Sequence, residues 1–232
     1  MRFYINASEM YEEVKRDLAE MGIEVHPKTM QDKNVEGDPN FYTKELQNYS
    51  YCLLSPNLKD LNDNLPIIQP WCDLEFEERI DFKHWPVNPG TAYLTRNEVW
   101  DEFLHDGKFA YSYNERLWYD NQLGKVIERI KKDPESRQLW VSIWNPSIDP
   151  NNLGGLSRVP CSLGYGFQIR KGKLNMHYIM RSCDFAVHFP DDVYLANKLL
   201  FWVAEQTGYE VGTFTHTIFS FHVYNKDIEG VF

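Results

Sequence analysis

The chain lacks features that define several classes of protein. Its 4 cysteines include no C-x-x-C pair, so the sequence indicates neither a zinc ribbon nor a thiol–disulfide redox motif. No apolar run approaches the length of a membrane span, and the first residues pass quickly into charged ones, unlike a secretory signal. We therefore expect free thiols in a reducing cytoplasm and no membrane partner.

An excess of basic residues is also lacking. The chain carries 24 Lys and Arg against 34 Asp and Glu, for a formal net charge of −10. Proteins that bind DNA normally present a basic face, so we expect no direct DNA binding. A local arginine cluster can still bind a small phosphate, because the local electrostatic potential, and not the net charge of the protein, determines the affinity for a small anion. Nucleotides therefore remain open as ligands.

The composition that is present, 43% hydrophobic and 25% charged, is that of a globular protein, and the length suits one domain over residues 1–232. The helices and strands predicted along it make this domain α/β (α+β). Apolar spacing and end signals predict helices over residues 7–21, 40–50, 94–106, 121–132 and 191–207. Alternation predicts strands over residues 139–144, 164–170, 174–180 and 214–224. The Pro-, Asn- and Asp-rich stretch 53–90 predicts irregular structure, and we treat residues 51–95 as a loop-rich insertion.

Residues that suit nucleophilic chemistry are concentrated in the second half of the chain. Cys161 alone proves little, because a single cysteine is more often a buried, inert thiol. It is followed by three polar groups in order: Arg181-Ser182-Cys183-Asp184, Pro190-Asp191-Asp192 and Ser220-Phe221-His222-Val223-Tyr224. A thiolate, arginines, a carboxylate pair and a His/Tyr pair are what a nucleophilic enzyme with a phosphorylated substrate needs.

Several motifs in this order resemble the thymidylate synthase family, including its bacteriophage pyrimidine hydroxymethylase branch. They are Asp133-Pro134-Glu135-Ser136-Arg137 with Val141–Pro146, Pro160-Cys161, Arg181–Asp184 and Phe221–Tyr224. Upstream, Lys44-Glu45-Leu46 resembles the family's helix that carries an essential glutamate. The resemblance implies a thymidylate-synthase-like fold, with a mixed twisted sheet flanked by helices and a homodimer formed through the sheet.

The resemblance also implies a mechanism and a role for each site residue. Cys161 would attack carbon 6 of a pyrimidine nucleotide, and carbon 5 would then take a methylene group from methylenetetrahydrofolate, with no metal involved. The thiolate is the reactive form of a cysteine, and nearby arginines favour it. For the nucleotide, the resemblance implies phosphate binding by Arg181 and Ser182, with Arg137 reaching the phosphate of the second subunit, and sugar binding by His222 and Tyr224. It implies that Glu45 organises water and proton transfers and that Tyr113 is an active-site aromatic. Trp100 and Asp184 are implied to contact the folate.

Asp192 bears on the choice of base. Synthases that act on uridylate carry asparagine at the position that it resembles, whereas a carboxylate can accept from the amino group of cytosine. A mismatch would leave buried polar groups unpaired, at a cost of about 1–3 kcal/mol each. The alternative is that Asp192 merely caps the helix that begins there, although Asp191 could be that cap instead. The sequence therefore favours dCMP as the substrate.

The product has two candidates. Met180, Ser162 and the short segment 228–232 depart from the pattern of methylating synthases and favour a wetter pocket. Hydroxymethylation of dCMP is therefore the leading hypothesis and methylation of dCMP its close rival, ahead of thymidylate synthesis from dUMP and of a non-catalytic nucleotide-binding homologue.

Two further positions depart from the family pattern. Gln138 stands where a second phosphate arginine is usual, and Lys28 or Arg158 are candidates to replace it. His188 stands where a small residue is usual, and for a lone histidine a structural role is favoured over a substrate contact.

Overall fold

The computed structural model describes residues 1–31, 33–153 and 158–232. Within them, a mixed sheet runs in the order β1-β5-β9-β8-β7-β6, with β2 also paired to β5. Its strands are β1 (Arg2–Tyr4), β2 (Ile23–Val25), β5 (Thr43–Leu53), β6 (Trp140–Ser142), β7 (Ser162–Arg170), β8 (Lys173–Asp184) and β9 (Glu210–Tyr224). A separate small ribbon pairs β3 (Thr29–Met30) with β4 (Lys33–Asn34). The predicted mixed sheet is confirmed.

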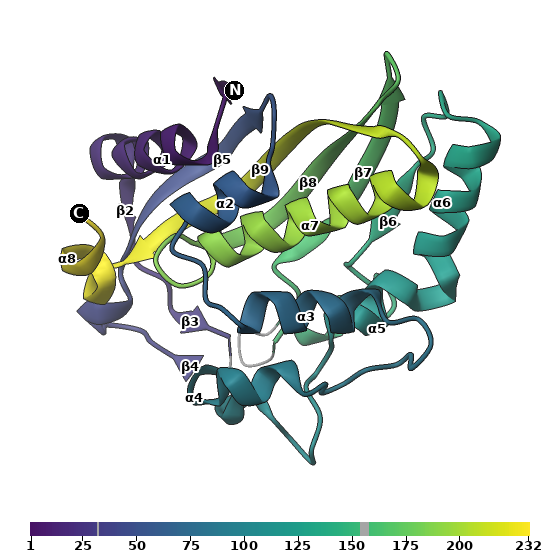
Figure 1. Cartoon of the computed structure of the whole chain (residues 1–232). Coiled ribbons are helices and arrows are strands. Elements are labelled where there is room, and N and C mark those ends of the chain that lie inside the picture. Colours follow the sequence, from purple (N-terminus) through teal and green to yellow (C-terminus); the bar gives the residue numbers. More distant parts are fainter. Residues whose placement is uncertain (32, 154–157) are drawn as a thin grey trace.

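Helices form a layer against one face of this sheet (Figure 1). They are α1 (Ala7–Met21), α2 (Leu58–Asn64), α6 (Gln122–Lys132) and α7 (Phe189–Thr207). Below the layer in this view lie α3 (Trp71–Ile80), α4 (Asn97–Trp100) and α5 (Tyr113–Trp118), and α8 (Ile228–Val231) lies near the C-terminus. The core forms between α7 and the sheet, where α7 buries most of its residues. None of the helices in the described ranges is long and apolar enough to cross a membrane.

The helix predicted over residues 7–21 is confirmed, and its ends follow the local sequence. The side chain of Asn6 accepts from the backbone N–H of Glu9 at 2.8 Å, while Glu9 accepts from Ile5 at 3.0 Å. Met10, Val14 and Leu18 are fully buried. The spacing of these residues is what an amphipathic helix needs to cover a sheet.

The helix predicted over residues 40–50 is wrong. These residues belong largely to β5, which pairs with β9 from Thr43↔Tyr224 to Leu53↔Phe214. The apolar residues at 42, 46 and 49 satisfy helical spacing, but long-range pairing decides the conformation of such a segment. Glu45 therefore lies on a strand and not on the helix that the family resemblance implied.

Two other stretches differ from their predictions. The stretch predicted to be irregular, 53–90, contains α2 and α3. The helix predicted over 94–106 is instead a series of short turns, of which α4 is one. The predicted helices near 121–132 and 191–207 and the predicted strands over 139–144, 164–170, 174–180 and 214–224 are confirmed, with shifts at their ends.

The strand directions bring the predicted site residues to one end of the sheet. Strands β8 and β9 are parallel, so that Asp184 is in register with His222. Strand β7 is antiparallel to β8, so its start, next to Cys161, lies at the same end. The start of β5 joins them because β5 is antiparallel to β9. Residues that are distant in the sequence thus gather around the Cys161 thiol.

Candidate active site

Two cavities meet at Cys161. One lies between α3, α7 and the end of β8, and the other lies over the ends of β5, β8 and β9. Besides Cys161, both are lined by a common set: Gln31, Trp100, Ser182, Asp184 and His188. We call them the α3 cavity and the strand-end cavity. Together they can accommodate a ligand that extends to both sides of the thiol.

The Cys161 thiol has a cationic neighbour. Nη2 of Arg181 lies 3.7 Å from Sγ of Cys161. The guanidinium is held by two carbonyls, with Nε donating to Pro160 at 2.9 Å and Nη2 to Val159 at 3.0 Å. Burial raises the pKa of the thiol, and the Arg181 charge opposes this shift more than any other group. Because the thiolate is the nucleophilic form, Arg181 is placed to favour the reactive state.

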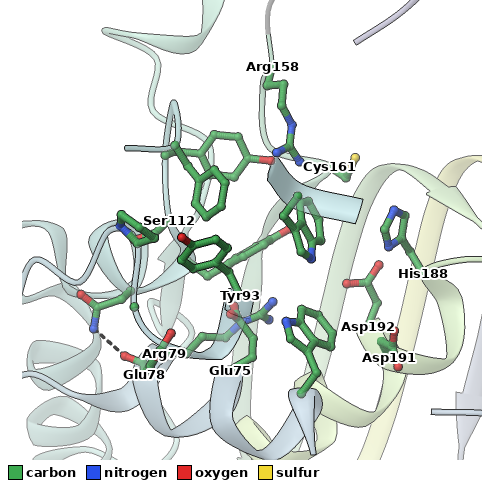
Figure 2. Close-up of a pocket in the computed structure, with 18 of the residues that line it drawn as sticks. Glu75, Glu78, Arg79, Tyr93, Ser112, Arg158, Cys161, His188, Asp191 and Asp192 are labelled. Carbon is green, nitrogen blue, oxygen red and sulfur yellow. Dashed lines mark hydrogen bonds and ion pairs between the residues drawn. The ribbon is translucent and has the colours of Figure 1, made fainter. Parts of the chain in front are cut away.

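Asp191 and Asp192 have separate roles, and neither is the N-cap of α7, which is His188. Asp191 is buried and accepts from Nη1 of Arg96 at 2.7 Å and from the backbone of Ile68 at 2.9 Å. Asp192 lines the α3 cavity (Figure 2), and Sγ of Cys183 lies 3.8 Å from its Oδ2. Burial raises the pKa of Asp192 to about 7. Both carboxyls line the α3 cavity, but Asp191 is engaged by Arg96 and Ile68, so Asp192 is the carboxyl of the pair that is more available to a ligand.

The opposite wall of the α3 cavity carries charged residues that the sequence analysis missed. Glu75 and Arg79 enter the cavity from α3, and Nε of Arg79 donates to Oε1 of Glu75 at 2.8 Å (Figure 2). The Arg79 guanidinium lies over the Tyr113 ring, 4.0 Å from its centroid. The sequence signal for this helix was the spacing of Glu75 and Arg79, an acidic and a basic residue four positions apart. It was overlooked because this stretch was interpreted as irregular.

Aromatic side chains form much of the remaining wall of the α3 cavity. Trp100 stacks near Trp71, with ring centroids 6.4 Å apart, and the Arg158 guanidinium lies 5.0 Å from the Trp100 ring. Tyr111, another residue that sequence analysis missed, also lines the cavity. Among the described residues, Nε1 of Trp100 and Nε of Arg158 are buried without a hydrogen-bond partner. A flat ligand with acceptor atoms fits such a wall.

Tyr113 and Ser162 are joined beneath the α3 cavity. The Tyr113 hydroxyl and the Ser162 Oγ are 3.0 Å apart, and Ser162 also bonds to the Tyr178 hydroxyl. Met180 is fully buried in the core. Ser162 is equally buried, so both residues that favoured a wetter pocket act beneath its surface.

The strand-end cavity contains the predicted sugar pair and Glu45. His222 and Tyr224 have ring centroids 5.1 Å apart. Glu45 is in register with His222 on the neighbouring strand and accepts a hydrogen bond from Ser220. Burial lowers the pKa of His222, which favours a neutral imidazole that can donate or accept. Lys226 and Arg181 add positive charge to this cavity.

Asp184 and His188 lie in the walls of both cavities. Burial raises the pKa of Asp184 to about 6, and its Oδ1 accepts from the backbone of Ala186 at 2.9 Å. Burial, with Arg96 and Arg158 nearby, lowers the pKa of His188 to about 3. His188 also lies 5.8 Å from the Trp100 ring. A neutral histidine therefore faces the site.

Two basic candidates, Arg137 and Lys28, lie away from the two cavities, as does Gln138. Arg137 and Gln138 are exposed, and Arg137 lines a separate hollow over β6 to β9 with Trp140. Lys28 is exposed and pairs with Glu36 at 2.7 Å. Arg158 is the candidate replacement for the second phosphate arginine that lines a site cavity.

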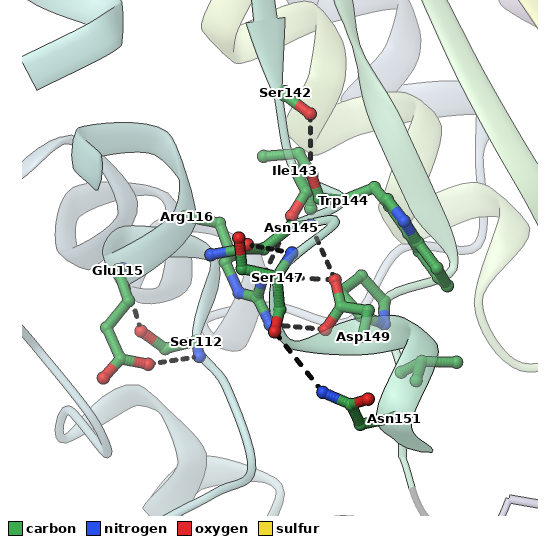
Figure 3. Close-up of polar contacts among 12 residues, drawn as sticks. Ser112, Glu115, Arg116, Ser142, Ile143, Trp144, Asn145, Ser147, Asp149 and Asn151 are labelled. Carbon is green, nitrogen blue, oxygen red and sulfur yellow. Dashed lines mark hydrogen bonds and ion pairs between the residues drawn. The ribbon is translucent and has the colours of Figure 1, made fainter. Parts of the chain in front are cut away.

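A buried ion pair supports the wall from outside the cavities (Figure 3). Arg116 of α5 binds Asp149 through two hydrogen bonds, of 3.1 and 2.7 Å. Asp149 also accepts from the backbone of Asn145 at 2.7 Å. The guanidinium lies 5.6 Å from the Tyr111 ring, so this pair connects the loop after β6 to the aromatic wall. Across the described ranges, no three His, Cys, Asp or Glu side chains are grouped to hold a metal ion.

Comparison with known proteins defines the class. The fold is similar to that of the solved thermostable thymidylate synthase A from Bacillus subtilis, with a TM-score of 0.73 at 21% identity, covering 97% of this chain and 82% of that one. The thymidylate synthase-like fold is therefore shown. The sequence model of the thymidylate synthase family matches residues 87–232.

Curated relatives agree with the family match. A putative thymidylate synthase of Methanosarcina mazei is 37% identical over 169 residues, covering 66% of this chain and 76% of the relative. One from Methanosarcina barkeri is 35% identical over 123 residues, covering 51% of this chain, and the chain spans only 55% of that relative's length. The chain belongs to the thymidylate synthase family.

Proposed function

We propose that the protein transfers a one-carbon unit from methylenetetrahydrofolate to carbon 5 of dCMP and releases 5-hydroxymethyl-dCMP. The observation that carries this proposal is the Cys161 thiol beside Arg181 at the meeting point of two cavities, with Asp192 on the wall of one. The thiolate adds to carbon 6 of the base, which makes carbon 5 nucleophilic. Family membership supports this type of covalent catalysis.

The two cavities divide the ligands between them. We assign the phosphate and sugar to the strand-end cavity, where Arg181, Ser182, His222 and Tyr224 lie. The base then lies over Cys161 and directs its amino edge to Asp192 in the α3 cavity. Methylenetetrahydrofolate supplies the methylene carbon, and Trp100 with Asp184 offers a flat surface and a carboxyl for its ring system. The unpartnered donors at Trp100 and Arg158 support the fit.

A carboxylate must also position water and accept the proton that leaves carbon 5. We propose Glu75 for this role instead of Glu45, because Glu75 lines the α3 cavity opposite Asp192, whereas Glu45 is bonded to Ser220 near the sugar pair. Glu45 then orients Ser220 and His222. This assignment replaces the helix-borne role that the sequence suggested for Glu45.

The hydroxymethyl product requires tetrahydrofolate to leave, water to add to the exocyclic methylene group on carbon 5, and the Cys161 thiolate to be expelled from carbon 6. Glu75 and Arg79 give the α3 cavity polar groups that can retain such a water. The rival outcome is hydride transfer, which gives a methyl group and dihydrofolate. The names of the relatives favour that rival, and with it dUMP as a substrate.

A direct assay separates these outcomes. The protein is incubated with methylenetetrahydrofolate and dCMP tritiated at carbon 5, and tritium release and dihydrofolate are both followed. Tritium release without dihydrofolate supports hydroxymethylation, and the two together support methylation. If neither tritium release nor dihydrofolate is seen with dCMP or with dUMP, the proposed catalysis is overturned. Asp192→Asn should shift preference from dCMP towards dUMP.

The proposed homodimer makes Arg137 a ligand of the partner's phosphate. Its exposure on the sheet face, away from Cys161, supports a role in trans. Cys161→Ser and Arg137→Ala should each abolish or weaken turnover, and mixing the two variants should restore activity. Restoration is expected because one site of a mixed dimer keeps both residues. No recovery after subunit exchange would contradict the trans role.

A further inference from the structure

The Arg79 side chain is a buried cation whose part in the proposed mechanism is so far limited to helping Glu75 retain water in the α3 cavity. Only 8% of its side chain is exposed, and burying a cation is costly unless acceptors surround it. Glu75 accepts from its Nε at 2.8 Å. In the described part of the chain, its Nη1 and Nη2 form no hydrogen bond to a protein acceptor, although Arg79 lines the α3 cavity. These donors are therefore available to a ligand.

The geometry holds the Arg79 donors in a fixed direction. The guanidinium carbon lies over the Tyr113 ring, 4.0 Å from its centroid, and this contact restricts the movement of the side chain. Trp118 donates through Nε1 to the Arg79 carbonyl at 3.1 Å, which ties this turn of α3 to α5. The arginine fork is thus rigid before a ligand arrives.

Asp192 faces the same cavity from α7 (Figure 2). Both side chains line the α3 cavity, and the Arg79 charge opposes the effect of burial on the pKa of Asp192, so the two groups offer a donor and an acceptor to one ligand. The edge of cytosine presents an amino donor beside an unprotonated ring nitrogen. The edge of uracil presents a carbonyl beside a ring N–H.

We propose that Arg79 donates to the ring nitrogen at position 3 of cytosine while Asp192 accepts from the neighbouring amino group. Arg79 is then a specificity-determining residue, because the ring N–H of uracil would meet the Arg79 N–H and neither could accept. The inference rests on the proposed function for the identity of the nucleotide. Arg79 on α3 is then a second residue that recognises the base, in addition to Asp192 on α7.

The test combines a protein change with a ligand change. Binding of dCMP and of its 3-deaza analogue, in which position 3 carries C–H, is measured by calorimetry on the complete chain and on Arg79→Met. In the unaltered protein the deaza change should weaken binding about 10- to 100-fold, as expected for a hydrogen bond to a charged group. In Arg79→Met the two nucleotides should bind alike, because the partner of the nitrogen is gone.

Controls separate this role from a loss of structure. Arg129→Met removes an exposed arginine and should leave both affinities unchanged. Deoxyribose 5-phosphate, which lacks a base, should bind the unaltered protein and Arg79→Met equally. Arg79→Lys keeps the charge and replaces Arg79→Met if that variant does not fold; it should lose most of the discrimination, since an ammonium lacks the planar fork.

Clear results would overturn the inference. If the unaltered protein binds the deaza analogue as tightly as dCMP, or if the deaza change weakens binding of the unaltered protein and of the Arg79 variant by the same factor, Arg79 does not read the ring nitrogen. Product formation is assayed separately on the same samples. If the deaza change weakens binding only when Arg79 is present, but no one-carbon unit is transferred to carbon 5, the proposed catalysis is refuted while the role of Arg79 is supported.

Discussion

Nη2 of Arg181 lies 3.7 Å from Sγ of Cys161 while the same guanidinium is held by the carbonyls of Pro160 and Val159. The cation and the thiol therefore belong to one preorganised unit. Burial raises the pKa of the Cys161 thiol, and Arg181 is the chief group that counters this rise. The reactivity of Cys161 should depend on Arg181 even in the absence of substrate.

Replacing Arg181 with Gln should make the Cys161 thiol less reactive. Loss of the cation raises the thiol pKa further, so alkylation at a fixed pH below that pKa should slow about 10-fold. The measurement is the rate of iodoacetamide labelling of the Cys161 peptide against pH, by mass spectrometry. Arg129→Gln serves as the control. An unchanged profile in Arg181→Gln would show that the arginine does not favour the thiolate.

Glu75→Gln and Glu45→Gln should affect different kinetic constants. Glu75→Gln removes the proposed proton acceptor and should lower kcat by about 10²- to 10⁴-fold. Glu45→Gln disturbs Ser220 and His222, so its main effect should be a higher KM for the nucleotide. Steady-state kinetics on both variants decide the matter. The opposite pattern would return the catalytic role to Glu45.

Asp192 should make stability depend on pH. Burial raises its pKa from 3.8 to about 7, so the folded protein binds more protons than the unfolded chain between these values. The contribution of Asp192 to the free energy of unfolding therefore falls as pH rises through this window. Asp192→Asn cannot titrate, so its melting temperature relative to the unaltered protein should rise from pH 4 to pH 7 and then level off. A difference that stays flat across the window would refute the shifted pKa.

Breaking the buried Arg116–Asp149 pair should destabilise the fold. Asp149→Asn leaves the Arg116 guanidinium buried without its carboxylate, and such a loss costs about 3–5 kcal/mol in free energy of unfolding. Urea unfolding measures the change. The exposed Arg129–Asp133 pair is the matched control, and Arg129→Gln should cost about 0–1 kcal/mol. If both variants lower the free energy of unfolding by the same amount, burial does not make the Arg116–Asp149 pair more important for stability than an exposed pair.

The sequence predicted the sheet-rich half well because its strands and α7 carry strong local signals. Apolar residues recur at every second position through most of β7 and β8, and α7 ends at Gly208, whose φ of 78° suits glycine. β5 was mistaken for a helix because its identity depends on pairing with β9, which is distant in the sequence. Local spacing carries no information about such a partner.

The continuous motifs in the sequence name residues that the structure brings to the same two cavities, but the sequence analysis missed residues of the cavity wall that come from other segments. Cys161, Ser182 and Asp184 line both cavities, and Asp192 lines the α3 cavity, as a shared site requires. Arg79 was missed because residues 53–90 were predicted to be irregular, so the i, i+4 spacing of Glu75 and Arg79 was not recognised as helical. The roles of the predicted residues stay predictions until they are tested in solution.

Trapping the covalent adduct tests the central claim most directly. A 5-fluoro analogue of dCMP blocks loss of the substituent from carbon 5, so the species that joins protein, nucleotide and the one-carbon donor should accumulate. Mass spectrometry of the intact protein and its peptides should place the adduct on Cys161 and find none in Cys161→Ser. Turnover of dCMP by Cys161→Ser, or an adduct on Cys183 instead, would contradict the account.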